Sequence, residues 1–261
     1  MDRITKILIP YDFTEVSRRA LEYAIAFAGK RPDKHIEICF MQPEEDQAAI
    51  EKAFAEITSG LTKAFRAKIS WVAFSPPSVA GLLKKCQWAQ PDLIIMGTSG
   101  SEDPEGTTHT SETVLSTECP VLVIPKDIGE EFQLKKIALV LGHKEIDDPN
   151  VLGTLLDVAR TFNAKVHVLT IENKPGTYGY SEGEERNEQL LEYYLENFYS
   201  HHVFIENEDV VKGIFDYVRE KEIDMLAILP RNHARRGTPS EGRLTRILTL
   251  QSRFPLLAIE H

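Results

Sequence analysis

Two kinds of hydrophobic pattern alternate along the chain. Continuous apolar runs occupy residues 92–97, 119–124 and 224–229, and they lack the period-two alternation of a half-exposed strand. Such runs are typical of strands that are covered on both faces. Between the runs, apolar residues recur every three or four positions, as they do on one face of a helix. The pattern predicts alternating strands and helices, and therefore a parallel, doubly wound α/β sheet.

The predicted helices have recognisable ends. The helix after the first strand has Thr14 or Ser17 available as its N-cap and Gly29 as its stop. Ser78 and Asp209 are placed to cap two later helices. We expect the apolar stripes of these helices to face the core and to form no binding surface.

The strand-like runs occur twice in the same order. The runs at residues 6–13, 92–97 and 119–124 match those at 136–143, 224–229 and 254–259, with offsets of 130, 132 and 135 residues. A nearly constant offset predicts a duplicated domain. We therefore expect two domains, residues 1–129 and 134–261, related by a pseudo-two-fold axis. Each is expected to hold a five-stranded parallel sheet with helices on both faces.

The predicted fold also predicts where a ligand would lie. In a doubly wound sheet the ligand crevice lies outside the carboxyl ends of the strands, at the point where the strand order reverses. In the first half this rule selects the loops after Tyr11, Met41 and Met96.

Composition and charge narrow the classes of partner. The chain has 261 residues, of which 42% are hydrophobic, and a formal net charge of −10. An acidic chain lacks the cations that nucleic-acid binding requires, and no apolar run approaches the roughly 20 residues that span a bilayer. We therefore expect a soluble, cytoplasmic protein with no nucleic-acid or membrane partner.

The chain has an odd number of cysteines at wide spacing, namely Cys39, Cys86 and Cys119. We therefore expect buried thiols and neither a disulfide framework nor a zinc site.

Two stretches of the first half carry a family resemblance. "ILIPYDFTEVSRRALEYA" and "DLIIMGTSG…SETVLSTECPVLVIP" resemble the opening strand and the closing loop, helix and strand of the universal stress protein family. "FNAKVHVLTI" and "RLTRILTLQSRFPLLAIE" extend the resemblance to the second half. It implies a tandem member of that family, with two Rossmann-like domains of the adenine nucleotide alpha hydrolase type.

The family resemblance also implies a nucleotide site in the first half. Members that bind ATP carry two glycines three residues apart, then a third glycine followed by Ser or Thr. The first two fall here on Gly97 and Gly100, but the third falls on Thr108, followed by His109 and Ser111. By the same resemblance Asp12 contacts the nucleoside and Met41 flanks the base. Asp12 has a second interpretation, as a cap of the following helix.

The altered loop favours weak or absent nucleotide binding. Thr108 places a Cβ where a backbone would approach phosphate closely. The spacer "SEDPEG" adds three carboxylates where a triphosphate would lie. We therefore expect a stress-response binding or regulatory protein with no catalytic residues, no metal site and no certain cofactor. The alternative is a protein that binds ATP with Mg²⁺ in the first domain only, with slow hydrolysis or autophosphorylation.

The second half offers a different candidate site. Gly142 and Leu229 stand at the positions of Asp12 and Gly97, so the glycine loop is lost. A basic segment follows, and its candidate anion-binding residues are Arg231, His233, Arg235, Arg236 and Arg243. This segment binds an anionic small molecule in one interpretation. In the other it is solvated or pairs with an acidic surface.

The family resemblance also bears on assembly. It implies that the two domains pair through their last strands, which would cover open sheet edges. The chain would then be a monomer or a homodimer that acts on an unknown protein partner. Two separated lobes in solution scattering would contradict this pairing.

Overall fold

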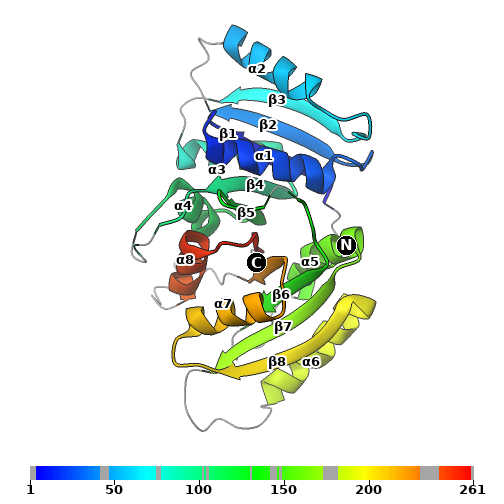
Figure 1. Cartoon of the computed structure of the whole chain (residues 1–261), viewed down its shortest axis with the longest axis vertical. Coiled ribbons are helices and arrows are strands. Elements are labelled where there is room, and N and C mark those ends of the chain that lie inside the picture. The colour runs from blue at the N-terminus through cyan, green and yellow to red at the C-terminus, as the bar shows by residue number, and fades with distance from the viewer. Residues whose placement is uncertain are drawn as a thin grey trace. The chain divides into compact units, whose positions relative to one another are not determined.

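The computed structural model (Figure 1) describes residues 4–41, 47–74, 78–101, 103, 106–129, 131–141, 146, 149–172, 182–229 and 241–259. The chain divides into two compact units. The first unit contains Ile4–Phe132 and also Thr249–Arg253. The second contains Gln133–Leu248 and Phe254–His261.

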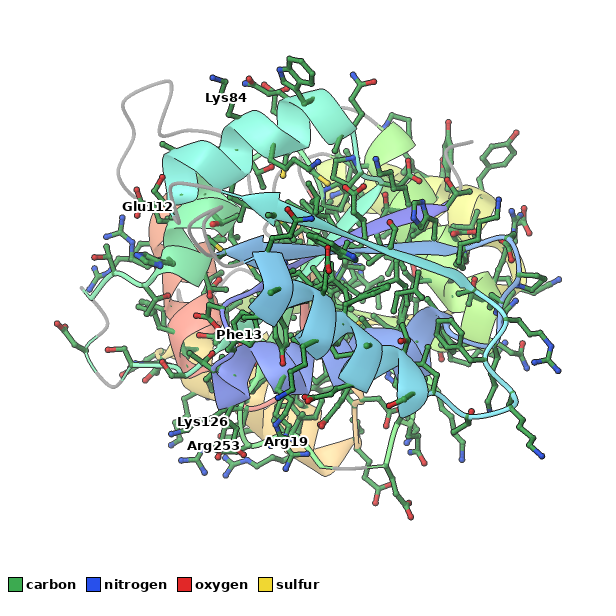
Figure 2. All side chains as sticks on the ribbon, turned by 90° about the horizontal axis from the view of Figure 1, so that it is seen from above. Phe13, Arg19, Lys84, Glu112, Lys126 and Arg253 are labelled. Carbon is green, nitrogen blue, oxygen red and sulfur yellow. The ribbon has the colours of Figure 1, made fainter. Side chains whose placement is uncertain are left out.

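The first unit is a five-stranded parallel sheet with helices on both faces. Its strands are β1 (Lys6–Tyr11), β2 (His35–Met41), β3 (Lys68–Phe74), β4 (Leu93–Thr98) and β5 (Val121–Pro125), in the order β3-β2-β1-β4-β5. Its helices are α1 (Glu15–Ala28), α2 (Gln47–Ser59), α3 (Val79–Ala89) and α4 (His109–Ser116). Figure 2 shows α3 on one side of this sheet and α1 and α2 on the other.

The second unit repeats this arrangement. Its strands are β6 (Lys136–Val140), β7 (Lys165–Glu172), β8 (Tyr199–Glu206), β9 (Met225–Ile228) and β10 (Leu256–Ala258), in the order β8-β7-β6-β9-β10. Its helices are α5 (Leu152–Phe162), α6 (Glu182–Leu195), α7 (Val210–Glu220) and α8 (Glu241–Gln251), of which the last three residues of α8 belong to the first unit. Two 3₁₀ turns lie at Pro149–Val151 and Glu196–Phe198. The predicted α/β fold with two Rossmann-like domains is confirmed.

The apolar runs become the buried strands, as the pattern predicts. All residues of β1 after Lys6 are buried, and so are all residues of β5 and β9. The helix caps also follow the sequence: α1 begins after Thr14 and ends at Gly29, α3 begins after Ser78, and α7 begins after Asp209.

An aspartate fixes the start of the central strand in each unit. Asp92 Oδ2 accepts hydrogen bonds from the backbone N–H groups of Thr5 and Lys6, both at 2.8 Å. In the second unit Asp224 Oδ2 accepts from the N–H groups of Lys135 and Lys136, at 2.7 and 2.9 Å. Each carboxylate satisfies two backbone donors that precede or open a strand, and the duplicated sequence therefore repeats in atomic detail.

The three thiols are packed inside the first unit. Cys39 and Cys86 are buried, and Cys119 is half-buried. Burial raises the pKa of Cys39 to about 12 and that of Cys86 to about 11. The thiols therefore act as small apolar groups, as expected.

No helix in the described part of the chain is both long and apolar enough to cross a membrane.

Candidate functional site

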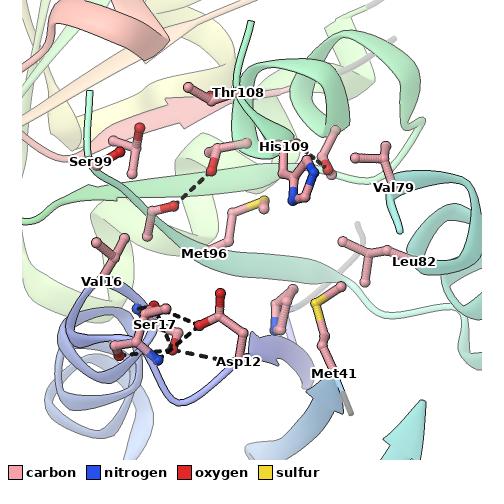
Figure 3. Close-up of a pocket in the computed structure, with 16 residues that line it drawn as sticks. Asp12, Val16, Ser17, Met41, Val79, Leu82, Met96, Ser99, Thr108 and His109 are labelled. Atoms are coloured by element: carbon pink, nitrogen blue, oxygen red, sulfur yellow. Dashed lines mark hydrogen bonds between the residues drawn. The ribbon is translucent and has the colours of Figure 1, made fainter. Parts of the chain in front are cut away.

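A cavity of about 290 Å³ lies at the carboxyl ends of the central strands of the first unit (Figure 3). The strand order reverses between β1 and β4, so the cavity lies where the doubly wound fold predicts a ligand. The residues that line it are Pro10, Asp12, Thr14, Val16, Ser17, Met41, Val79, Leu82, Met96, Gly97, Thr98, Ser99, Thr108, His109, Thr110 and Thr113.

The structure brings most of the candidate nucleotide residues together. Those that line the cavity are Asp12, Met41, Gly97, Thr108 and His109. Gly100 and Ser111 do not line it. Of the candidate anion-binding residues, Arg231, His233, Arg235 and Arg236 lie outside the described residues, while Arg243 is exposed on α8.

Asp12 closes β1 and holds the start of α1. Its Oδ1 accepts hydrogen bonds from the backbone N–H of Thr14 at 3.1 Å and from the Thr14 hydroxyl at 2.6 Å. Thr14, and not Asp12, is the N-cap, because Thr14 Oγ1 accepts from the N–H of Ser17. Asp12 therefore supports the cap from outside the helix.

The environment of Asp12 keeps its carboxyl group ionised. Partial burial alone would raise its pKa, but hydrogen bonds from Thr14 and Ser17 outweigh burial and lower the pKa below its usual value. Within the described part of the chain, Oδ2 of this carboxylate has no hydrogen-bond donor, and Figure 3 shows Asp12 at the cavity. A hydroxyl or amine of a ligand would supply the missing donor.

Gly97 is required by close packing between α1 and β4. A Cβ at this position would lie 2.3 Å from the backbone oxygen of Val16 and 2.6 Å from Val16 Cγ1. The Gly97 carbonyl also accepts a hydrogen bond from Thr110 Oγ1 at 2.7 Å. The first glycine of the pattern therefore has a structural role whether or not a ligand binds.

The second glycine forms a turn whose N–H groups have partners in the protein. Gly100 has a φ of +72°, a conformation that suits glycine. Its N–H donates to Thr98 Oγ1 at 3.1 Å, and the N–H of Ser101 donates to the carbonyl of Leu250 at 2.9 Å, within the same unit. Two N–H groups that a phosphate loop would offer to a ligand are therefore already bonded.

A capping box closes the start of α4. Thr108 Oγ1 accepts from the N–H of Ser111 at 3.1 Å, and Ser111 Oγ accepts from the N–H of Thr108 at 2.9 Å. Ser111 is fully buried, so its hydroxyl serves the helix and faces no ligand. Among the described residues, the N–H groups of His109 and Thr110 have no acceptor, and both residues line the cavity.

The charges of the cavity are few. The described residues that line it include one carboxylate, from Asp12, and one imidazole, from His109, but neither Lys nor Arg. No group of three or more His, Cys, Asp or Glu side chains in the described part of the chain is arranged to hold a metal ion. A polyphosphate would therefore meet no side-chain cation on these walls.

One wall of the cavity is apolar, and the sequence did not indicate the part of it that α3 contributes. Met41, Val79, Leu82 and Met96 form this wall. Val79 and Leu82 belong to the apolar stripe of α3 that was expected to face only the core, but they line the cavity as well. The helical spacing of apolar residues does not show which of them line a cavity, because the same side chains pack in the core and against the cavity.

Comparisons with known proteins agree with this fold. Residues 3–125 match the model of the universal stress protein family. A universal stress protein from Archaeoglobus fulgidus superposes with a TM-score of 0.73 at 14% identity, covering 99% of both chains. A Pseudomonas aeruginosa protein assigned to the same family gives 0.62 at 15% identity, covering 98% of this chain and 93% of its own. No curated protein matches the sequence.

A further similarity lies outside that family. The cytoplasmic domain of a prokaryotic cation chloride cotransporter superposes with a TM-score of 0.56 at 9% identity, covering 98% of this chain and 95% of its own. At these identities the structural similarities show the shared fold.

Proposed function

Since the chain belongs to the universal stress protein family, with the family domain at residues 3–125, we propose that it is a regulatory binding protein that catalyses no reaction. Its first domain binds the nucleoside part of a nucleotide in the cavity between β1 and β4 and holds the phosphates only weakly. The protein regulates a protein partner in the cytoplasm in response to this binding.

The shape and polarity of the cavity support a nucleoside. The apolar wall of Met41, Val79, Leu82 and Met96 suits the flat, weakly polar face of a base. The free Oδ2 of Asp12 suits a ribose hydroxyl, which is the contact that an acidic residue makes in other doubly wound nucleotide sites. At about 290 Å³ the cavity is also at the small end of the roughly 300–1,000 Å³ of small-molecule pockets.

The observation that carries the proposal is the small number of phosphate-binding groups among the described residues around this cavity. Those that line it include no Lys or Arg, and the N–H groups of Gly100 and Ser101 are bonded to Thr98 and Leu250. What remains is the start of α4, where His109 and Thr110 offer two N–H groups and the positive end of the helix dipole. This suffices for one phosphate group held loosely, but not for three.

The assembly of the protein is also a proposal. As the family implies, we expect the β5 and β10 edges to pair, within one chain or between two. The Arg-rich segment that includes Arg243 remains a candidate for a second, anionic ligand.

Calorimetric titration of the nucleotide-free protein with adenosine, AMP and Mg²⁺·ATP tests the proposal. We expect the three affinities to agree within about tenfold, since phosphates add little. Asp12→Ala should weaken all three by about tenfold, which corresponds to the loss of one hydrogen bond to a charged group. Asp127→Ala, at an exposed turn after β5, is the control and should bind like the wild type.

The possible outcomes separate the alternatives. If Mg²⁺·ATP binds a hundredfold more tightly than adenosine, or is hydrolysed, the protein is an ATP-binding member and the proposal is wrong. If none of the three ligands binds at millimolar concentration, the cavity is not a nucleoside site.

A further inference from the structure

Two histidines and a tyrosine meet on the second unit, far in sequence from any residue of the cavity. His167 on β7 and His201 on β8 are register partners across the two strands. Their ring centroids lie 4.5 Å apart. Tyr217, on α7 over the same face, is buried, whereas His201 is exposed. The cluster is therefore open to solvent on one side and closed on the other.

The nitrogen atoms of both rings point toward the same oxygen. His167 Nδ1 lies 2.9 Å from the Tyr217 hydroxyl, and His201 Nε2 lies 3.5 Å from it. A tetrahedral metal ion with bonds of 2.0–2.1 Å to nitrogen holds its ligand atoms about 3.3 Å apart. The two measured separations lie on either side of that value, so each histidine nitrogen lies at a ligand-like distance from the tyrosine oxygen, and the two rings lie side by side with centroids 4.5 Å apart.

We propose that His167, His201 and Tyr217 form a binding site for a divalent transition-metal ion such as Zn²⁺ or Cu²⁺. His167 Nδ1 and His201 Nε2 supply two strong ligands, the Tyr217 hydroxyl supplies a third, weaker one, and water fills the remaining positions. The sequence alone offered only the neighbouring pair His201 and His202, which point to opposite faces of a strand. The pairing with His167 exists only across the two strands.

A supporting contact fixes the His201 ring. Its Nδ1 lies 2.9 Å from the Ser200 hydroxyl. The Ser200 hydroxyl can accept a hydrogen bond from Nδ1–H, and in that tautomer Nε2 carries the lone pair that a metal needs, which is the usual arrangement around histidine ligands. Nε2 is thereby the nitrogen that is directed at Tyr217.

The charges around the cluster determine how tightly it is expected to bind a metal ion. Lys136 and Lys221 lie close enough to act electrostatically on His167, and both oppose a bound cation, although Lys136 Nζ is 3.9 Å from the Glu222 carboxylate. We therefore expect binding in the micromolar range and not the tight binding of a structural zinc site.

The fold itself does not require this cluster. The first unit has Glu37, Ser70 and Cys86 at the same places, as the third residue of β2, its partner on β3 and the eighth residue of α3. There Glu37 lies 3.9 Å from Lys6 Nζ and 3.6 Å from Lys85 Nζ, in an ion-pair network. Because the first unit folds with serine at the position of His201, a serine there is compatible with this architecture.

The test is a titration of the full-length, tag-free protein, stripped with a chelator, with ZnCl₂ and separately with CuCl₂. Calorimetry gives the affinity, and the electron paramagnetic resonance spectrum of bound Cu²⁺ counts the nitrogen ligands. The variants are His201→Ser, which places the first unit's residue in the second, and His167→Gln. His202→Gln is the matched control, because His202 is the neighbouring residue and bonds to Thr170 at 2.9 Å.

We expect the wild type and His202→Gln to bind one ion with equal affinity and to show two nitrogen ligands. Each of the other variants should lose about tenfold or more in affinity and show one nitrogen ligand, with an unchanged circular dichroism spectrum. Equal affinity in all four proteins, or binding that depends on His202 and not on His201, would overturn the site. Neither result depends on whether the first domain binds a nucleoside.

Discussion

The two units agree at the amino ends of their strands and differ at the carboxyl ends. Asp92 and Asp224 make the same pair of backbone hydrogen bonds at the start of β1 and β6. Lys6 Nζ and Lys136 Nζ each donate to a carbonyl at the end of the helix that precedes β4 or β9, at 2.9 and 2.7 Å. At the other end of the strands, Gly97 on β4 corresponds to Leu229 after β9. The contacts that hold the central strand are therefore the same in both units, whereas the residues at the carboxyl ends differ.

This difference has a physical basis. Two backbone donors at the start of the central strand point to one carboxylate in each unit, and a hydrogen bond to a charged acceptor contributes more than one to a neutral acceptor. The loops at the carboxyl ends carry no such requirement unless a ligand or a close helix imposes it. A second divergence lies on the sheet face beneath α3 and α7, where Glu37 pairs with lysines in one unit and His167 pairs with His201 in the other. Each unit thus has its own candidate chemistry on one common scaffold.

The largest expected effect comes from removing the close approach of α1 to β4. Gly97→Ala places a Cβ 2.3 Å from the Val16 carbonyl oxygen, so α1 or β4 must move, and we expect a loss of about 2–3 kcal/mol in the free energy of unfolding. Trp71 and Trp88 both lie in the first unit, so tryptophan fluorescence during urea unfolding reports on this unit.

Gly129→Ala is the control, because no atom lies within 4 Å of a Cβ built there. A loss in Gly97→Ala no larger than that of the control would show that the glycine is retained for a ligand and not for packing.

The next largest effect tests whether the two aspartates at the starts of β1 and β6 stabilise their units equally. Asp92→Ala and Asp224→Ala each leave two backbone N–H groups without an acceptor, and each should cost about 2 kcal/mol. Tryptophan fluorescence should detect the loss in Asp92→Ala directly, while circular dichroism follows both units. The equivalence of the two aspartates would be refuted if one variant lost more than twice as much stability as the other.

Much of the fold could be predicted from the sequence, because strands that are buried on both faces of a sheet appear as continuous apolar runs. β4 and β9 appear in the sequence as apolar runs. Ser78 and Asp209 cap the helices to which they were assigned, and Thr14, one of two candidates, caps α1. The repeat then follows from the spacing of such runs. None of this needs knowledge of side-chain contacts.

The candidate site could be predicted only in outline. The switch-point rule located the cavity, but its apolar wall uses Val79 and Leu82, whose helical spacing indicates only a core face. The bonded state of the Gly100 and Ser101 N–H groups depends on Thr98 and on Leu250, which is far away in sequence. The meeting of His167 with His201 likewise depends on strand register, which one sequence does not reveal.

The smallest expected effect separates the structural role of Asp12 from its proposed role in binding. Asp12→Ala removes the acceptor for the Thr14 N–H and hydroxyl, and should cost about 1 kcal/mol of unfolding free energy at pH 7. Because folding lowers the pKa of this carboxyl below its usual value, its stabilisation is fully present above the unfolded-state pKa and is lost as the pH falls through the folded-state pKa. The difference between variant and wild type should therefore shrink in urea titrations as the pH is lowered from 7 into the acid range where this carboxyl is protonated. Asp127→Ala, measured alongside, should show no such trend, and a cost for Asp12→Ala that stays constant with pH would show that the ionised carboxylate does not hold the start of α1.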